Sequence, residues 1–61
     1  MPLINVQLLA GRTPEQKRAL MRGLAQAAMD TIGVPEASIR VILTEVEPEH
    51  WGIGLKSKAE P

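Results

Sequence analysis

The stretch that decides the fold is Leu9-Ala10-Gly11-Arg12-Thr13-Pro14-Glu15-Gln16, where an extended segment gives way to a helix. Thr13 is a good helix cap, Pro14 suits the first helical position, and Gln16 completes a capping box with Thr13. The residues Ala10-Gly11-Arg12 then form a short loop. Three agreeing signals therefore predict a helix that starts here, directly after a strand.

The spacing of hydrophobic residues on both sides of this stretch supports a strand before it and a helix after it. Upstream, apolar and polar residues alternate from Pro2 to Leu9, which is the period-2 pattern of a strand. Downstream, apolar residues recur at helical spacing to about Ile32, where Gly33 and then Pro35 end the helix. The expected core stripe of the helix consists of Leu20, Leu24, Ala27 and Ala28, widened by Met21, Ala25 and Ile32.

A second strand is predicted from Ser38 to Val46, with Ile39, Val41 and Leu43 on one face and Ile42 on the other. Apolar residues on both faces are typical of a strand that is covered on both sides. The order strand, helix, strand predicts one βαβ unit with parallel strands and a right-handed crossover.

The last segment, Glu47–Pro61, is rich in Pro, Gly and charged residues, and it predicts a short hairpin or loop around His50–Gly54. The expected fold class is therefore α/β (α+β), in a single domain that spans residues 1–61.

The small size of the chain predicts an oligomer. A chain of 61 residues buries only about 60% of its unfolded surface, and small domains compensate with disulfides, metal ions or association. The sequence has no Cys, and its one His is His50, so disulfides are excluded and a transition-metal site is not expected. A second copy of the chain is the simplest cover for the open sheet face and edges.

Composition also limits the classes of partner. Seven basic and seven acidic residues balance, so the basic excess of a nucleic-acid-binding protein is missing. The sequence contains no apolar run of membrane-spanning length, and its start lacks the basic and apolar regions of a signal peptide. We therefore expect a cytoplasmic protein that binds neither nucleic acid nor a membrane.

Pro2 follows Met1, and a small second residue favours removal of the initiator methionine. The new terminus would be a secondary amine, with a reference pKa of roughly 7.7–8.0 that burial lowers towards neutrality. Such a group can act as a general base. The alternative interpretation is that Pro2 only starts a strand.

Two arginines and the single aromatic residue are further candidates. Arg40 lies in the most apolar strand, so it either pairs with Glu45 or Glu47 or binds an anionic ligand. Arg12 is either a solvated loop cation or a ligand-binding group, and Trp51 is either a pocket wall or part of a subunit interface.

Taken together, these pieces resemble 4-oxalocrotonate tautomerase and its small relatives in the tautomerase superfamily. The resemblance covers nearly the whole chain, and the residues that carry it are Pro2, the stretches Leu9–Lys17 and Ser38–Glu45, and Trp51-Gly52-Ile53-Gly54. The chain departs from the family at Ala10, where Glu is common, at Trp51, where Phe is usual, and in the tail after Gly54. Relatives that dehalogenate haloacrylates carry a carboxylate near Ile53, so hydrolytic dehalogenation is not expected.

The resemblance implies a fold, an assembly and a site. The βαβ units would form dimers with a four-stranded sheet covered by two helices, and three dimers would form a homohexamer. Pro2 would be the general base. Arg12 would bind the distal carboxylate, and Arg40 the 2-oxo or enol oxygen and the near carboxylate, each arginine reaching the proline from a neighbouring subunit. Leu9 and Trp51 would contact the substrate, and neither a metal nor an organic cofactor is expected.

The reaction implied by the resemblance is the isomerisation of a 2-hydroxy-2,4-dienoate, such as 2-hydroxymuconate, to a 2-oxo-3-enoate, as in aromatic hydrocarbon catabolism. One alternative is a proline-dependent tautomerase of phenylpyruvate-like monoacids, for which Arg12 would matter little. A second is a non-catalytic oligomeric module, which would follow if Met1 were retained and the Pro2 nitrogen remained an amide.

Overall fold

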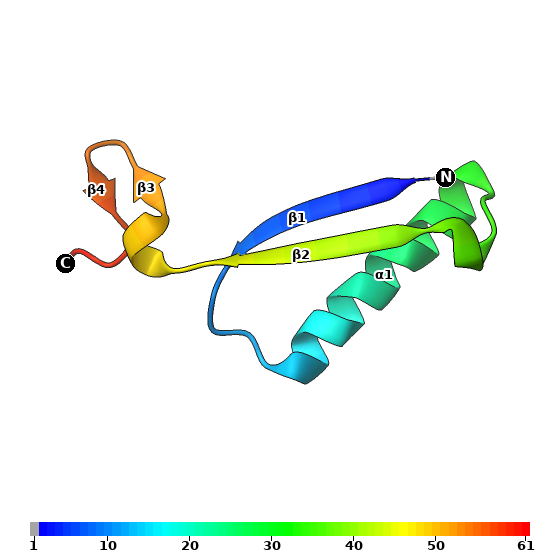
Figure 1. Cartoon of the computed structure of the whole chain (residues 1–61), viewed down its shortest axis with the longest axis horizontal. Helices are drawn as coiled ribbons and strands as arrows, with labels where there is room; N and C mark the ends of the chain where they lie inside the picture. Colours follow the sequence, from blue (N-terminus) through cyan, green and yellow to red (C-terminus); the bar gives the residue numbers. More distant parts are fainter. Residues whose placement is uncertain (1) are drawn as a thin grey trace.

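The chain folds into a two-stranded sheet, one long helix and a small hairpin, in a computed structural model that describes residues 2–61. The elements are β1 (Leu3–Leu9), α1 (Pro14–Ile32), β2 (Arg40–Val46), β3 (Gly52–Ile53) and β4 (Lys56–Ser57). Single 3-10 turns at Glu36–Ser38 and Pro48–His50 precede β2 and β3. Figure 1 shows α1 running back from the end of β1 to the start of β2, and the hairpin lying beyond the end of β2.

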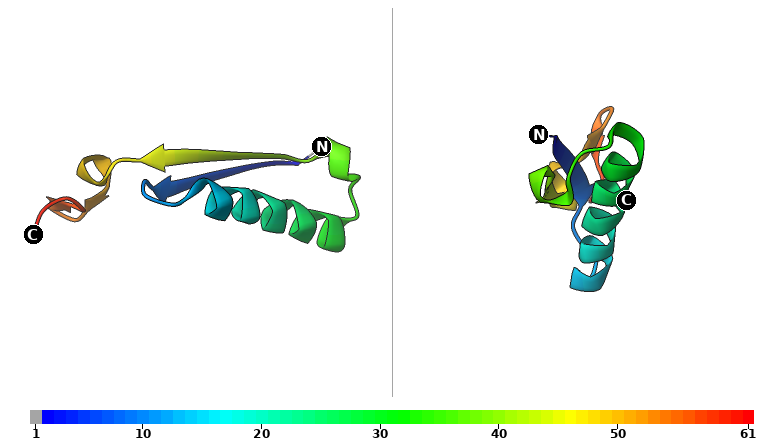
Figure 2. Two further views of the ribbon diagram at one scale, coloured as in Figure 1. Left: turned by 90° about the horizontal axis from the view of Figure 1, so that it is seen from below. Right: turned by 90° about the vertical axis from the view of Figure 1, so that its right-hand side faces the viewer.

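The two long strands are parallel, as predicted, and α1 connects them along one face of the sheet (Figure 2). Their register runs from Leu3 opposite Arg40 to Leu9 opposite Val46. One further hydrogen bond extends the ladder, because the N–H of Ala10 donates to the carbonyl of Val46 at 2.9 Å. The β1–α1–β2 order of the fold is therefore confirmed.

Both predicted ends of the helix are confirmed. The Gln16 N–H donates to the Thr13 hydroxyl at 3.1 Å, and the Thr13 N–H donates to the Gln16 side-chain oxygen at 2.9 Å. Pro14 is the first helical residue. At the other end Gly33 has a positive φ of 68°, and its N–H donates to the carbonyl of Met29 at 3.2 Å.

The predicted start of the second strand is wrong by two residues. Residues 36–38 form a 3-10 turn, and both the N–H and the hydroxyl of Ser38 donate to the carbonyl of Pro35, at 3.0 and 2.8 Å. The Ile39 N–H is likewise used within the turn. Since these donors are occupied locally, pairing with β1 begins only at Arg40. The first strand also starts one residue later than predicted, at Leu3 rather than Pro2.

A single copy of the chain is open rather than compact. The solvent-accessible surface is 4725 Å², against about 3,900 Å² for a compact protein of this mass. The radius of gyration is 14.5 Å, against about 10.5 Å for a compact domain of this length. No residue within the described range 2–61 is buried.

The helix-facing side chains of the sheet, Ile4, Val6, Leu8, Val41 and Leu43, are only half-buried. The expected core stripe of the helix is correspondingly incomplete. Met21, Leu24, Ala25 and Ala28 are half-buried, whereas Leu20, Ala27 and Ile32 are exposed. Leu20 is 37% exposed and Ile32 is 63% exposed. Two strands form a sheet too narrow to cover the whole apolar side of α1, which packs mainly against β2. Only a sheet of more than two strands would cover the whole predicted stripe.

The predicted hairpin is present, and it projects from the body of the molecule (Figures 1 and 2). Its turn contains Gly54, whose φ is 61°, and Leu55 at its tip is fully exposed. The N–H of Lys58 donates to the carbonyl of Trp51 at 2.8 Å and closes the base. Among residues 2–61, no helix is both long and apolar enough to cross a membrane.

Candidate active site

The predicted site residues lie at opposite ends of the sheet. Pro2 and Arg40 are adjacent at one end, where the Arg40 N–H donates to the carbonyl of Pro2 at 3.1 Å. Leu9 and Arg12 lie at the other end of β1, and Trp51 follows the end of β2. A strand of this length spans roughly 20 Å. One copy of the chain therefore brings Pro2 next to the backbone of its own Arg40, whereas the resemblance implied an Arg40 from a neighbouring subunit. It leaves Pro2 far from the other three residues.

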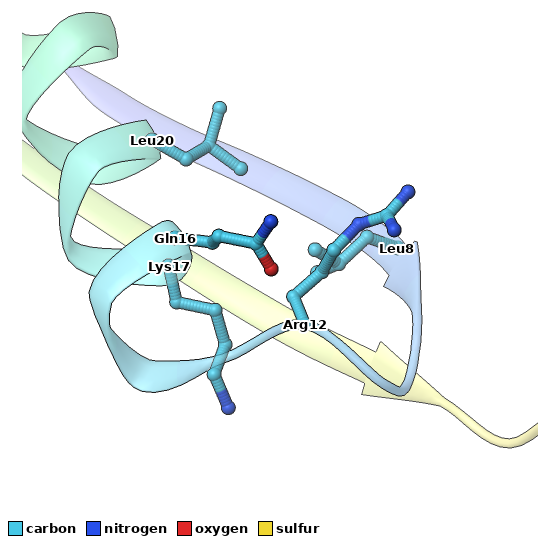
Figure 3. Close-up of a pocket in the computed structure, with 5 residues that line it drawn as sticks. All are labelled: Leu8, Arg12, Gln16, Lys17 and Leu20. Carbon is cyan, nitrogen blue, oxygen red and sulfur yellow. The ribbon is translucent and has the colours of Figure 1, made fainter.

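Arg12 lines an open pocket of about 230 Å³ beneath the end of β1 (Figure 3). The other lining residues are Leu8, Gln16, Lys17 and Leu20, so the pocket lies between β1 and the first two turns of α1. Its walls combine aliphatic side chains with two basic groups. A pocket of this composition suits a small organic anion, whose carbon chain contacts the leucines while a carboxylate meets the guanidinium.

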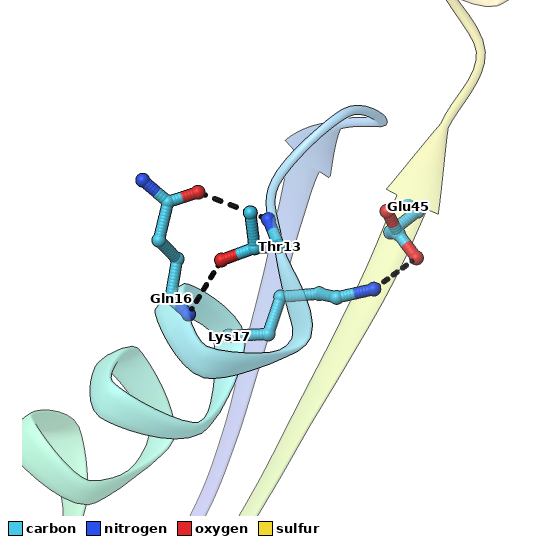
Figure 4. A network of polar contacts seen from close by, with 4 residues as sticks. All are labelled: Thr13, Gln16, Lys17 and Glu45. Carbon is cyan, nitrogen blue, oxygen red and sulfur yellow. Dashed lines mark hydrogen bonds and ion pairs between the residues drawn. The ribbon is translucent and has the colours of Figure 1, made fainter.

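The loop that carries Arg12 is held at both sides. On one side Ala10 bonds to Val46, and on the other the capping box fixes Thr13 to the first turn of α1. Gly11 between them has a φ of 125°, which favours glycine. Figure 4 shows a further bond at this junction, in which the Lys17 ammonium lies 2.9 Å from a carboxylate oxygen of Glu45.

Of the two alternatives for Arg40, the ion pair with Glu45 or Glu47 is not formed among residues 2–61. Among residues 2–61 the ion pairs are Lys17 with Glu45 and Arg18 with Glu15. The Arg40 guanidinium instead donates through Nη1 to the carbonyls of Ala37 at 2.8 Å and Ile39 at 3.2 Å.

Period-2 alternation explains why this pairing fails, and the sequence already contained the signal. Positions 40 and 45 are separated by an odd number of residues, so they lie on opposite faces of β2. Glu45 lies on the face that carries α1, and Arg40 shares the open face with Leu3 and Ile42. Arg40 is exposed there and retains N–H groups for an anionic ligand.

Leu9 and Trp51 are half-buried. Leu9 closes β1 opposite Val46 in the register. The Trp51 N–H donates to the carbonyl of Pro48 at 3.2 Å, and its own carbonyl accepts from Lys58, so the backbone of Trp51 anchors the hairpin.

Sequence inspection missed Lys17 as part of the candidate site. It occupies the same helical face as Met21, Leu24 and Ala28, so a cation interrupts an apolar stripe. A lysine within an apolar stripe indicates that its ammonium has a specific polar partner, so the sequence already contained a signal for Lys17. No group of three or more metal-ligating side chains occurs within residues 2–61. Met1, and with it the predicted exposure of the Pro2 amine, lies outside the described residues.

Known proteins of one family match nearly the whole length of this chain. A family model described as tautomerase enzyme matches residues 2–60. A probable tautomerase of Ralstonia nicotianae is 55% identical over 53 residues, which cover 87% of this chain and 76% of that protein. The 2-hydroxymuconate tautomerase of Stutzerimonas stutzeri is 40% identical over 57 residues, or 93% and 90% of the two chains. The solved heterohexameric 4-oxalocrotonate tautomerase of Chloroflexus aurantiacus superposes with a TM-score of 0.93 at 45% identity, over 98% of this chain and 97% of that one.

Proposed function

This chain belongs to the tautomerase family of enzymes, as a homologue of 4-oxalocrotonate tautomerase, and we propose that its substrate is a 2-hydroxy-2,4-dienoate of the 2-hydroxymuconate type. The product would be the 2-oxo-3-enoate. The observation that carries the proposal is the position of Pro2, which directly follows Met1 and lies beside the Arg40 backbone at the start of β1.

Proton transfer is the chemical task of Pro2. Removal of Met1 makes its nitrogen a secondary amine, which is the only basic proline nitrogen the chain can supply. The hydroxyl proton leaves O2, the C2–O bond becomes a carbonyl, the two double bonds become one between C3 and C4, and a proton is added at C5. The amine accepts and returns this proton, so the reaction consumes no second reagent.

Arg40 would stabilise the charge that develops on the substrate. A positive group near O2 and the adjacent carboxylate lowers the energy of the dienolate more than that of the starting enol. Two observations support this role. The side chain lies on the open face of the sheet, and it has no carboxylate partner among residues 2–61.

Arg12 would bind the distal carboxylate of a diacid, while Leu9 and Trp51 would contact its carbon chain. Binding the far end of the substrate turns binding energy into orientation at the reacting end. The position of Arg12 in an open pocket with aliphatic walls supports this assignment.

A second copy of the chain would complete the site. One edge of β1 has no strand partner within residues 2–61. If two β1 edges pair in the antiparallel sense, the Pro2 end of one chain lies beside the Leu9 and Arg12 end of the other. This arrangement would give the four-stranded sheet that the resemblance implies. We propose that three such dimers form a homohexamer, whereas the Chloroflexus aurantiacus relative is a heterohexamer.

The test is the rate of 2-hydroxymuconate isomerisation by protein whose amino-terminal Pro2 has been verified by intact mass. We expect turnover well above the uncatalysed rate, and sedimentation of a single species near six protomer masses. The control is the same protein with Met1 retained, which has an amide at Pro2 and should be inactive. Equal activity of the two forms would refute proline catalysis, and a stable monomer would refute the assembly.

A further inference from the structure

We infer that the ion pair between Lys17 and Glu45 is a positioning device for Arg12, an inference that rests on the proposed role of Arg12 in binding the distal carboxylate. The Lys17 Nζ and the Glu45 Oε1 lie 2.9 Å apart, and their side chains are 27% and 38% exposed. The pair joins the first turn of α1 to the end of β2, across 28 positions of sequence.

The pair and the strand ladder fix the two ends of the same short loop. Before Arg12, the N–H of Ala10 is bonded to Val46. After it, Lys17 is bonded to Glu45, which is the neighbour of Val46 on β2. The chain from Ala10 to Lys17 is therefore attached at both ends to adjacent residues of one strand.

The capping box transmits the second attachment to Arg12. Thr13 and Gln16 are bonded reciprocally, and the Lys17 N–H donates to the carbonyl of Thr13 at 3.0 Å. These bonds tie the segment from Thr13 to Lys17 into one turn, and Figure 4 shows the two Thr13–Gln16 bonds beside the Lys17–Glu45 pair. Since Arg12 directly precedes this turn, release of Lys17 from Glu45 would let the loop and the guanidinium shift.

The ion pair also determines which cation of the pocket is free to bind an anion. Arg12 and Lys17 both line it, but the Lys17 ammonium is occupied by Glu45. Neither ion pair among residues 2–61 involves Arg12. Loss of Glu45 would make the pocket more positive while releasing the helix, so the positioning and electrostatic effects of Glu45→Gln on substrate affinity have opposite signs.

This opposition makes Glu45→Gln the decisive variant. If the pair positions Arg12, Glu45→Gln raises KM for a diacid about three- to fivefold, and kcat stays within about twofold. KM for a monoacid such as 2-hydroxy-2,4-pentadienoate stays within about twofold as well, because it has no distal carboxylate. If Glu45 acts only through its charge, KM for the diacid falls.

Two further variants separate positioning from general stability. The charge exchange Lys17→Glu with Glu45→Lys should return KM for the diacid towards the wild-type value. Arg18→Gln breaks the neighbouring Arg18–Glu15 pair, which is 3.6 Å long and 60% and 77% exposed, and it should leave both substrates unaffected. Thermal unfolding and sedimentation of every variant identify any that fail to fold or assemble.

Arg12→Ala in the same experiment distinguishes failure of the inference from failure of the proposed function. If Arg12→Ala raises KM for the diacid selectively and Glu45→Gln does not, the positioning role is refuted while the role of Arg12 stands. If Arg12→Ala affects both substrates equally, or the wild type turns over neither, the proposed function and this inference fall together. A Glu45→Gln variant that lowers KM, or a charge exchange that restores nothing, also overturns the inference.

Discussion

The two ends of the β1–β2 sheet are built very differently. The end that carries Arg12 is fixed within one chain by the Ala10–Val46 bond, the capping box and the Lys17–Glu45 pair. The end that carries Pro2 and Arg40 has backbone pairing but little side-chain support, since among residues 2–61 the Arg40 guanidinium bonds only to nearby carbonyls. The Arg12 end of the candidate site is thus preorganised within a single chain, whereas the Pro2 and Arg40 end is less supported by that chain.

The largest effect is expected at the less supported end, from blocking the Pro2 amine. Acetylation confined to the Pro2 amine, with Lys17 unmodified, removes the base while leaving the contacts of the β1–α1 junction intact. General base catalysis contributes roughly 10²- to 10⁴-fold, so we expect kcat to fall by about that factor, with KM little changed. Stopped-flow measurements on mass-verified acetylated protein, compared with a mock-treated control, provide the test. Full activity of the acetylated protein would remove Pro2 from the mechanism.

Arg40→Ala should have the next largest effect, in kcat. A hydrogen bond to a charged group contributes roughly 1.5–3 kcal/mol, so its loss costs about one to two orders of magnitude. Diacids and monoacids should be affected alike, because both develop charge at O2. Arg40→Lys should recover only part of the rate, since an ammonium lacks the planar fork of the guanidinium. An effect confined to KM would show that Arg40 only binds the substrate.

Arg12→Ala tests the preorganised end and should chiefly change KM. We expect KM for a diacid to rise about tenfold, which corresponds to the loss of about 1.4 kcal/mol of binding energy. Turnover of a monoacid should be nearly unchanged. If Arg12→Ala and Arg40→Ala change the same parameter on both substrates, the proposed difference between the two ends is wrong.

Local signals explain what could be predicted from the sequence. The start of α1 was predicted correctly because Thr13, Pro14 and Gln16 act within one turn, and its end because Gly33 supplies the positive φ. The start of β2 was misplaced because the apolar pattern continues through Ile39, although the turn after Pro35 already uses its N–H. Local pattern therefore determines where elements lie but not where pairing between them begins.

Tertiary and quaternary features could not be predicted in the same way. The exposure of Leu20 and Ile32 depends on how many strands lie over the helix, and one chain supplies only two. The choice of Lys17 as the partner of Glu45 depends on the packing of α1 on β2. The separation of Arg12 from Pro2 follows from the length of β1. These features depend on contacts between segments that lie far apart in the sequence, so the pattern within any one segment does not predict them.

The smallest predicted effect concerns the rigidity of the preorganised end itself. Thr13→Ala removes the hydroxyl of the capping box, which typically costs about 1 kcal/mol of stability. Thr31→Ala is the matched control, because its hydroxyl donates to the carbonyl of Ala27 at 2.6 Å near the other end of the same helix, and such back-bonding does not stabilise helices.

We expect Thr13→Ala to lower the midpoint of thermal unfolding and to raise KM for a diacid about twofold, because a looser first turn lets Arg12 move. Thr31→Ala should change neither quantity. If both variants lower the unfolding midpoint equally and neither changes KM, the capping box stabilises α1 without positioning Arg12. The rigidity of this end would then depend on the Lys17–Glu45 pair and the Ala10–Val46 bond alone.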